Sequence, residues 1–417
     1  MFRPLIHHTF GPHVTLPYAL RSLLLLLQPW QWRHGRHHEA LRSKLEQSFG
    51  GRAFLFSSGR EALLALLRSI GLRCGEEVIL QAYTCVVVPN AIHAAGGVPV
   101  YADVDGDTLN LDLADVKRRI TTRTRAVIAQ HTFGIPANLN RLRSLCDERG
   151  ILLIEDCAHA LPDDGSSPLG RTGDFTLLSF GRDKAISGVS GGAILSRSAH
   201  VSSALQVTER HARPLPQSII ARYLCYPLIY RKARALHMIG LGTCALHLCK
   251  SLHLLLPIVT PEEKQGRMPP LLRQCPNACA ALTLYTLGQL PKINAHRREL
   301  TLFYVRECSK QGWNILPGIN EAHALQKFPL FFKKADLIRK SLKTQDIHLE
   351  DGWSGCVVCP RDSDAGALGF ATGDDPKAES LCEEIISLPT HPTMSTKQAR
   401  RLLTVLRETL GTLGIEN

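Results

Sequence analysis

What this 417-residue chain lacks excludes several common protein classes. It has no Walker loop, no dinucleotide-binding G-x-G-x-x-G, no G-x-S-x-G and no zinc-protease motif, which argues against enzymes built on those motifs. Its leucine run Leu23–Leu27 is far shorter than the roughly 20 apolar residues that span a bilayer. Residues 1–12 lack the apolar core of a signal peptide. We therefore expect a cytoplasmic protein without a transmembrane segment.

The chain also lacks a regular cysteine framework. Its 13 cysteines have no repeating spacing, and several lie in apolar segments, which favours reduced thiols over disulfides. Cys356 and Cys359 form a lone C-x-x-C, and Cys275 with Cys279 has an unsuitable spacing. A zinc site that combines these pairs is less favoured than incidental cysteines. The histidines near position 37 favour a basic surface, so we predict no metal.

Acidic residues are scarce in one stretch of an already basic chain. The chain carries 49 Lys and Arg against 37 Asp and Glu, a net charge of +12, and no acid lies between Arg213 and Pro261. Within a segment at 200–265 we expect basic amphipathic helices, such as 218–236 and 237–256. This segment fits a helical insertion packed on the core or on a dimer partner; the alternative is contact with a membrane surface or a lipid-linked substrate. No nucleic-acid-binding signature accompanies the charge.

Between residues 50 and 198, apolar runs of strand length alternate with segments of helical periodicity. We expect strands at 78–80, 98–103, 126–130, 151–155, 175–179 and 192–195, and helices at 60–70, 85–95, 113–120 and 139–149. Such alternation predicts an α/β fold with a mostly parallel central sheet between two helical layers. Ligands of these sheets bind beyond the carboxyl ends of the strands.

The flanking segments suggest three parts. Residues 1–49 form a basic segment with helices near 17–27 and 39–49, and 50–285 form the three-layer large domain that contains the 200–265 insertion. Residues 286–417 form a smaller C-terminal α/β domain, which ends in an amphipathic helix at 396–410. A long helix is expected at 278–307.

Two residues at strand ends carry the strongest chemical signal. Lys184 follows the run Leu177–Ser179, and Asp156 ends the run Ile151–Glu155. Pyridoxal phosphate requires an amine that condenses with its aldehyde and a carboxylate that keeps its ring nitrogen protonated. A buried aspartate also needs such a partner, unless it caps a helix or forms an ion pair. Together the two residues favour a pyridoxal-phosphate site.

Neighbouring residues could complete this site. Ser58, Gly59 and Arg60 lie between an expected strand and helix, where free backbone N–H groups favour a phosphate, although a simple helix cap fits equally well. Ser179 could donate its hydroxyl to the same phosphate. Near Asp156, the small Ala158 could lie against a flat ring, and His159 could bond the cofactor or substrate. Ser179 and His159 each also have an ordinary structural role open to them, as does His131 at the end of the preceding strand.

These residues belong to an ordered set of motifs that resembles the DegT/DnrJ/StrS family of sugar aminotransferases, pyridoxal-phosphate enzymes of the aspartate-aminotransferase fold. The matching segments, in chain order, are Ser57–Leu63, Gly75–Ile79, Gly97–Asp105, Glu155–Ala160 and Ser179–Gly192. The resemblance is strong over 50–198 and resumes more weakly at 281–298 and 387–390. It implies that Lys184 and Asp156 hold the cofactor, that Gly59, Arg60 and Ser179 hold its phosphate, and that His159 takes a position often occupied by glutamine.

The chain departs from the family pattern in several places. The residue that stacks on the cofactor ring, usually aromatic, is here Cys85 or, with a shift, Tyr83. The Gly-Glu-Gly-Gly that follows the lysine becomes Val189–Gly192, and the Asn-x-Arg segment that reaches a neighbouring subunit is not visible near 275–277. The 200–265 segment has no counterpart in the usual nucleotide-sugar enzymes.

The resemblance implies a homodimeric aminotransferase that moves an amino group from glutamate or glutamine to a keto sugar. We expect that sugar to be nucleotide-activated, or else lipid-linked, and to serve polysaccharide or glycolipid synthesis. A sugar dehydratase that keeps the cofactor is one alternative, although such relatives typically lack the lysine. The other is a non-catalytic, membrane-associated regulator.

Overall fold

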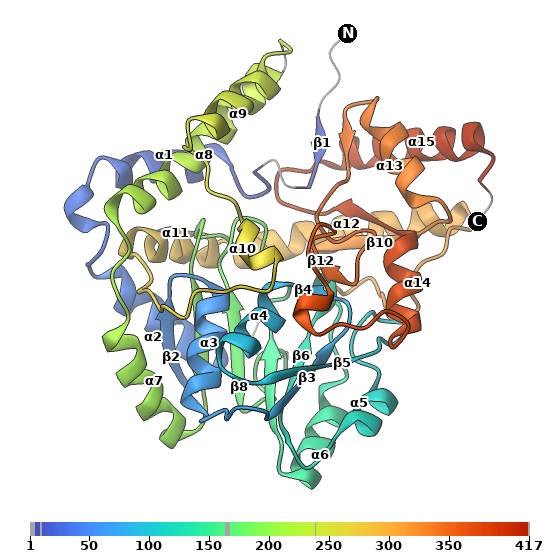
Figure 1. Ribbon diagram of the computed structural model, residues 1–417. Helices are drawn as coiled ribbons and strands as arrows, with labels where there is room; N and C mark the ends of the chain where they lie inside the picture. Colours follow the sequence, from blue (N-terminus) through green and yellow to red (C-terminus); the bar gives the residue numbers. More distant parts are fainter. Residues whose placement is uncertain (1–4, 9–10, 163–166, 238, 416–417) are drawn as a thin grey trace.

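The computed structural model describes residues 5–8, 11–162, 167–237 and 239–415. Its centre is a seven-stranded sheet in the order β2-β9-β8-β7-β6-β3-β5 (Figure 1). β9 is antiparallel to β2 and β8, and every other neighbouring pair is parallel. The predicted mostly parallel α/β sheet is therefore confirmed. The strand bounds are β2 Arg52–Phe56, β3 Glu77–Gln81, β5 Val98–Ala102, β6 Thr124–Gln130, β7 Leu152–Asp156, β8 Phe175–Ser179 and β9 Gly192–Ser196.

Alternation along the strands divides the core into two layers. In β2, Phe54 and Phe56 join the cluster under α3 and α4, whereas Ala53 and Leu55 join the cluster under α2. Period-two alternation sends successive side chains to opposite faces, so both faces are apolar and both are covered. The covering helices are α2 His37–Phe49, α3 Gly59–Ser69, α4 Val87–Ala94, α5 Leu113–Arg119, α6 Leu139–Arg149 and α7 Ala199–His211. Of these, α7 was not predicted.

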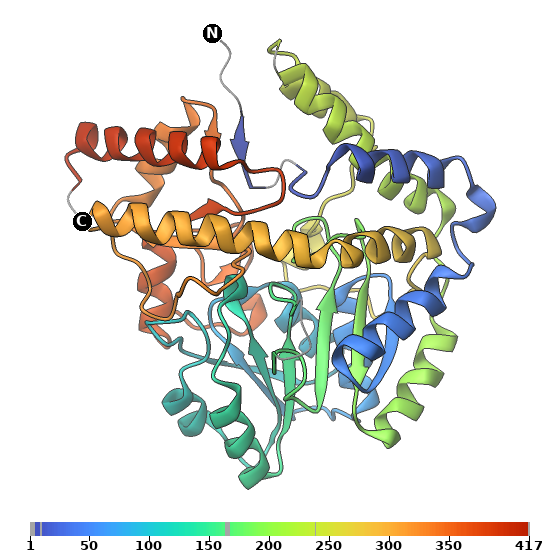
Figure 2. The same ribbon diagram turned by 180° about the vertical axis from the view of Figure 1, so that it is seen from behind.

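The predicted single helix at 278–307 is wrong. The structure has α11 Asn277–Gly288 and α12 Leu290–Lys310, with Gln289 between them. Pro291 explains the break, because proline lacks an N–H and fits only the first turn of a helix. α12 runs behind the sheet toward the C-terminal part of the chain (Figure 2).

The C-terminal part is built on short strand pairs. β10 Lys327–Phe331 pairs with β13 Ile385–Pro389, and the helices are α13 Ala335–Lys343, α14 Pro376–Glu384 and α15 Thr396–Leu413. β1 Ile6–His7 pairs with β11 Ile347–His348, and β12 Val358–Cys359 pairs with β4 Thr84–Cys85. Both ends of the chain therefore meet here. The three-part division at 49 and 285 remains our proposal.

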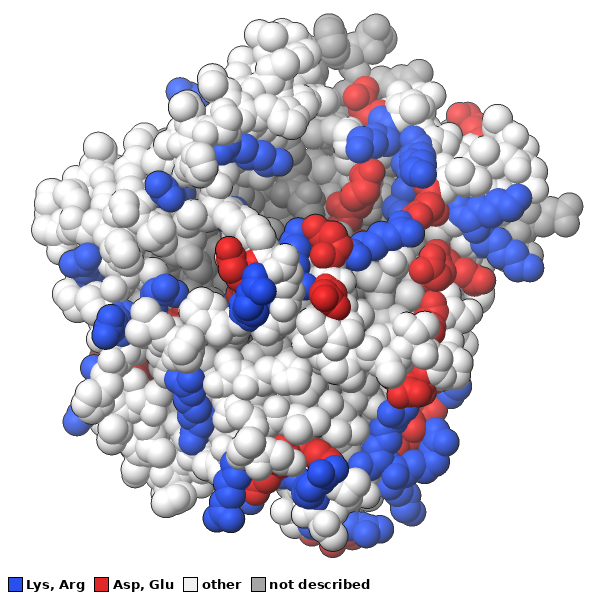
Figure 3. All heavy atoms as spheres, in the orientation of Figure 1, with Lys and Arg blue, Asp and Glu red and all other residues white. Residues whose placement is uncertain are grey.

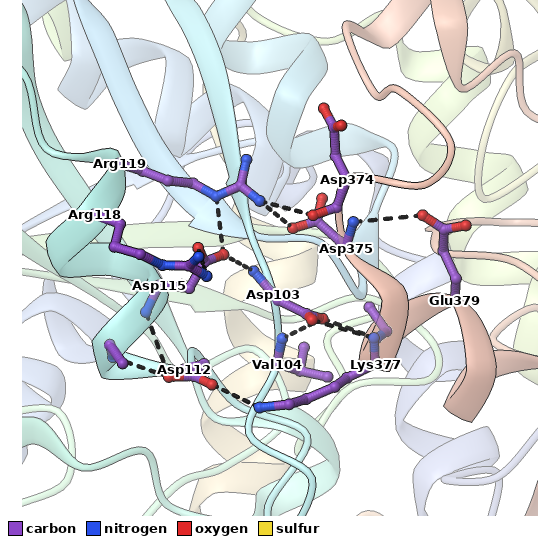
Figure 4. Close-up of polar contacts among 12 residues, drawn as sticks. Asp103, Val104, Asp112, Asp115, Arg118, Arg119, Asp374, Asp375, Lys377 and Glu379 are labelled. Atoms are coloured by element: carbon purple, nitrogen blue, oxygen red, sulfur yellow. Dashed lines mark hydrogen bonds and ion pairs between the residues drawn. The ribbon is translucent and has the colours of Figure 1, made fainter.

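A network of charged side chains joins this part to the sheet edge. Arg119 of α5 contacts Asp115 at 2.9 Å and Asp375 at 2.8 Å, and Asp103 accepts hydrogen bonds from the backbone at the start of α14 (Figure 4). Asp103, Asp115 and Asp375 are all buried. Burial and the neighbouring carboxylates raise the pKa of Asp375 to about 7, although Arg119 opposes the shift.

The acid-free segment forms two helices, as predicted, α8 Gln217–His237 and α9 Gly242–Ser251. The short helix α10 Pro261–Lys264 follows it. α1 Leu16–Leu26 packs on α8, and α8 packs on α9. In both views α9 projects beyond the body of the molecule (Figures 1 and 2). Among the described residues, no helix is both long and apolar enough to cross a membrane.

Candidate active site

The site lies where the carboxyl ends of several strands meet. A cavity of about 40 Å³ is bordered there by eight of the predicted residues, Gly59, Arg60, Cys85, Asp156, Ala158, His159, Ser179 and Lys184. Gln130, Val87, Val88, Leu63, Leu177 and Trp353 complete its lining. The parallel sheet brings these residues together because β6, β7 and β8 all end at this edge.

Lys184 is held by its backbone on both sides. Its N–H donates to the carbonyl of Gly181 at 3.3 Å, and its carbonyl lies 2.8 Å from His13 Nε2. The next residue, Ala185, donates to the carbonyl of Ala158 at 3.3 Å. The loop that carries the lysine is therefore tied to the segment that follows Asp156, which fixes the relative positions of the two.

His159 is the side chain that contacts the lysine amine. Its Nε2 lies 3.3 Å from Lys184 Nζ, while Phe133 N–H donates to its Nδ1 at 3.4 Å. Burial, together with the positive charges of Lys184 and Lys327, lowers the pKa of His159 well below its ordinary value, so the ring is neutral. Because Nδ1 accepts a hydrogen bond, the single proton of the neutral ring lies on Nε2 and faces the amine. Uncharged lysine can accept this proton in a hydrogen bond.

Asp156 is a buried carboxylate at the end of β7. Its Oδ1 accepts the N–H of Ala158 at 2.9 Å. Burial raises the pKa of Asp156, while that hydrogen bond and the positive charge of Lys184 lower it. A buried carboxylate is stabilised by a cationic hydrogen-bond donor. Asp156 is therefore suited to a ligand that presents such a donor.

The start of α3 forms a second part of the site. Ser58 is the N-cap, and its hydroxyl accepts the N–H of Glu61 at 3.3 Å. Gly59 and Arg60 begin the helix, where backbone N–H groups lack intrahelical acceptors and favour an anion. A Cβ on Gly59 would lie 2.9 Å from the Cβ of Ser179. Glycine is required here because the helix start approaches the end of β8 so closely.

The Arg60 side chain is already engaged. Its guanidinium pairs with buried Glu263 of α10 and donates to the carbonyl of Ile258 at 2.5 Å. The sequence predicted a phosphate ligand at this position. Because the Arg60 side chain contacts Glu263 of α10 and Ile258, its contribution to a phosphate would come from its backbone N–H.

Of the two residues considered for stacking on a cofactor ring, Cys85 borders the cavity and Tyr83 does not. The Tyr83 ring instead packs edge-on against Trp353 at 5.6 Å and Phe133 at 6.0 Å. Trp353 was missed by sequence reasoning. Its ring lies 4.8 Å from that of His159, and it comes from the C-terminal part of the chain. The Gly-Trp-Ser-Gly run at 352–355 is a weak local signal of a loop and does not indicate a site.

His131 does not reach the lysine. Its Nε2 lies 3.5 Å from Glu155, and its Nδ1 accepts the N–H of Ala137 at 3.0 Å. The electrostatic interaction between His131 and Asp156 lowers the pKa of the carboxyl, so the influence of His131 on the site is indirect.

A larger cavity of about 830 Å³ adjoins the first and shares seven of its residues, Gly59, Arg60, Cys85, Val87, Ser179, Lys184 and Trp353. Ser58 borders this cavity as well. The opposite wall is largely apolar and comes from the acid-free segment and its flanks, through Ile219, Tyr223, Leu256, Pro257, Ile258 and Val259.

Comparison with known sequences identifies relatives of one kind. The sequence model of the DegT/DnrJ/EryC1/StrS aminotransferase family matches residues 20–219 and 272–407. GDP-perosamine synthase of Vibrio cholerae is 38% identical over 143 residues, 34% of this chain and 39% of that protein. The L-glutamine:2-deoxy-scyllo-inosose aminotransferase of Streptomyces kanamyceticus is 37% identical over 142 residues, 34% of this chain and 33% of that protein. The chain thus spans less than half the length of the curated relatives it matches.

Solved structures share the fold over nearly the whole chain. NtdA of Bacillus subtilis, solved with its cofactor PMP, aligns with a TM-score of 0.74 at 19% identity, covering 98% of this chain and 86% of that one. An aminotransferase from Psychrobacter cryohalolentis aligns with a TM-score of 0.71 at 17% identity, covering 99% of each chain. These matches confirm the predicted fold. The family model leaves residues 220–271, which include most of α8 and all of α9 and α10, unmatched.

Proposed function

The chain belongs to the DegT/DnrJ/EryC1/StrS aminotransferase family, and from this membership we propose that it is a pyridoxal-phosphate-dependent aminotransferase acting on a keto sugar. The observation that supports this most directly is that Lys184 and Asp156 border one cavity, with the lysine amine 3.3 Å from a neutral histidine. The motif order predicted from the sequence and the shared fold support the same assignment.

The residues present fit the cofactor. When bound, pyridoxal phosphate supplies an aldehyde that condenses with amines and a ring that accepts electrons from the substrate carbon. Asp156 offers a buried carboxylate for the ring nitrogen, and the start of α3 with Ser58, Gly59 and the Arg60 N–H offers donors for the phosphate. Ser179 lies against Gly59 and adds a hydroxyl. Cys85 and Ala158 border the same space and are assigned to the two faces of the ring.

We assign the proton transfers to Lys184. Its amine holds the cofactor before reaction and, once released, takes a proton from the substrate carbon and returns one during transfer of the amino group. His159 positions this amine, because its Nε2–H can donate to Nζ only when the amine is uncharged. Asp156 keeps the ring nitrogen protonated, which requires a carboxylate close to a cation.

The substrate class is inferred from the relatives. One of them is named a GDP-perosamine synthase, and another is named an aminotransferase with L-glutamine as the donor and 2-deoxy-scyllo-inosose as the acceptor. We extend this to glutamate or glutamine as donor and to a keto sugar, nucleotide-activated or lipid-linked, as acceptor in polysaccharide or glycolipid synthesis. The 830 Å³ cavity has room for an acceptor larger than a free sugar. A homodimer and a cytoplasmic location, in keeping with 13 free cysteines, belong to the same proposal.

The direct experiment compares wild type with Lys184→Ala and Lys184→Arg after incubation with pyridoxal phosphate. We expect visible absorbance of the lysine-bound cofactor in the wild type alone, since arginine keeps the charge but cannot condense with the aldehyde. Transfer of ¹⁵N from labelled glutamine to a keto-sugar acceptor then separates transamination from dehydration. Absence of bound cofactor in the wild type would refute the proposal, and turnover without nitrogen transfer would favour a dehydratase.

A further inference from the structure

The segment that the family model leaves unmatched forms an outlying helix with an apolar surface. α9 packs mainly on α8 and otherwise projects from the body (Figure 1). Leu241, Leu248 and Leu252 lie on or next to it at helical spacing, and each is 53% to 60% exposed. Because leucines at this spacing share one helix face, α9 presents an uncovered apolar stripe.

α1, which packs on the other side of α8, has a similar stripe. Leu16, Leu20, Leu23, Leu24 and Leu27 recur at helical spacing and are 38% to 65% exposed, and Trp30 follows at 72%. The opposite face of α1 is buried through Tyr18, Ala19 and Ser22. The helix therefore carries apolar residues toward solvent as well as toward the core. Monomeric proteins rarely expose such contiguous apolar surface without a partner.

The charge of this lobe, defined as α1, α8 and α9, has a single sign. No Asp or Glu occurs at 1–38 or 214–261, whereas Arg21, Arg231, Lys232 and Lys250 are exposed. Figure 3 shows blue without red over the upper-left part of the molecule, where this lobe lies in Figure 1. Exposed leucines interspersed with cations and without acids are typical of surfaces that lie on anionic lipid.

A lobe-to-lobe contact between two copies of the chain is a poor match. In a two-fold dimer built on this lobe alone, the lobe meets its own copy, so its cations would face cations with no acid to compensate them. A bilayer with anionic headgroups satisfies both features at once, since its phosphates attract the lysines and arginines while its acyl boundary accepts the leucines. We propose that the α1–α8–α9 lobe docks the protein peripherally on an anionic lipid bilayer. This inference rests on the lobe alone and does not depend on the reaction proposed for the cavity.

The test is co-sedimentation of the full-length, cofactor-loaded protein with phosphatidylcholine vesicles, with and without phosphatidylglycerol. We expect the protein to bind only the vesicles that contain phosphatidylglycerol, and we expect salt to weaken this binding. Lys232→Gln with Lys250→Gln should reduce partitioning about fivefold per cation, from about 1 kcal/mol per charge at the surface. Leu248→Ser with Leu252→Ser should reduce it about tenfold or more. Leu337→Ser and Lys340→Gln, both exposed on α13 outside the lobe, are the matched controls and should change nothing.

Sedimentation velocity of each variant completes the experiment. The proposal is overturned if the wild type does not bind anionic vesicles, or if the lobe variants bind as wild type does. It is also overturned if the leucine variants dissociate an oligomer while vesicle binding is unchanged, because the occupant of the lobe would then be a second copy. Circular dichroism and cofactor absorbance identify any variant that fails to fold.

Discussion

The buried carboxylate Asp375 should make the stability of this protein decrease as pH rises toward neutrality. Its side chain is 1% exposed and lies near Asp103, Asp115 and Asp374, with Arg119 as its cation (Figure 4). Its pKa is raised from 3.8 to about 7. The perturbation that isolates the effect is Asp375→Asn, which removes the ionisation and keeps an oxygen that can accept the hydrogen bond from Arg119.

The sign and size follow from the two pKa values. Below about pH 4 the carboxyl is protonated in both the folded and unfolded states. Between about pH 4 and 7 the folded protein keeps a proton that the unfolded chain has released, so the free energy of unfolding falls as pH rises. Above about pH 7 both states have released the proton, and the free energy of unfolding no longer falls through this group. The shift corresponds to about 4 kcal/mol at about 1.4 kcal/mol per unit. Because Asp374, one of the carboxylates that raise the pKa, is exposed and screened by solvent, we expect roughly half of that.

The assay is urea unfolding of wild type and variant at a series of pH values from 4 to 8. The difference in unfolding free energy should move in favour of Asp375→Asn by roughly 2 kcal/mol across this range. Asp374→Asn is the matched control, since its side chain is exposed beside the same site and its removal should change the slope little. If the free energy of unfolding depended on pH in the same way in wild type and in Asp375→Asn, the reasoning would be refuted.

Four further outcomes are expected. Gly59→Ala should weaken cofactor binding about tenfold in a fluorescence titration, because its Cβ would lie 2.9 Å from Ser179. His159→Gln should keep cofactor absorbance and most of the turnover, whereas His159→Phe should lose turnover, since phenylalanine cannot bond the amine. Glu263→Gln should lower the free energy of unfolding, measured in urea, by roughly 2 kcal/mol, because it removes the carboxylate partner of Arg60. Burial lowers the pKa of His13 to about 4, so the free energy of unfolding should fall as pH falls from about 6.5 to 4. His13→Asn should reduce this fall, as measured by acid unfolding.

The site residues that could be predicted from the sequence lie next to recognisable strand or helix ends. Asp156 and Ser179 end apolar runs, Ser58 and Gly59 separate a strand from a helix, and Lys184 follows a strand by five residues. Strand ends meet at one edge of a parallel sheet whatever the details of packing. The cavity in which these residues meet therefore followed from their order along the chain.

The parts that could not be predicted depend on contacts between distant segments. Trp353 reaches His159 from nearly 200 residues away, and Glu263 meets Arg60 across a similar separation. No periodicity or spacing in the sequence encodes such contacts. The N-terminal histidines are a further example, since His8 and His13 belong to a basic segment by composition yet are buried against the C-terminal part and the lysine loop.

The unmatched segment at 220–271 connects these observations. Tyr223 and residues 256–259 of this segment contribute to the apolar wall of the large cavity. Glu263 pairs with the Arg60 side chain, which borders both cavities, and α9 carries the exposed leucines. Lys184, Asp156 and the start of α3 all lie in the part that the family model matches. The residues assigned to the cofactor therefore come from a different part of the chain than Glu263 and much of the apolar wall of the large cavity. If this division is correct, substitutions in α9 should leave cofactor absorbance unchanged, whereas substitutions at Glu263 should alter the affinity for the acceptor before they alter the affinity for pyridoxal phosphate.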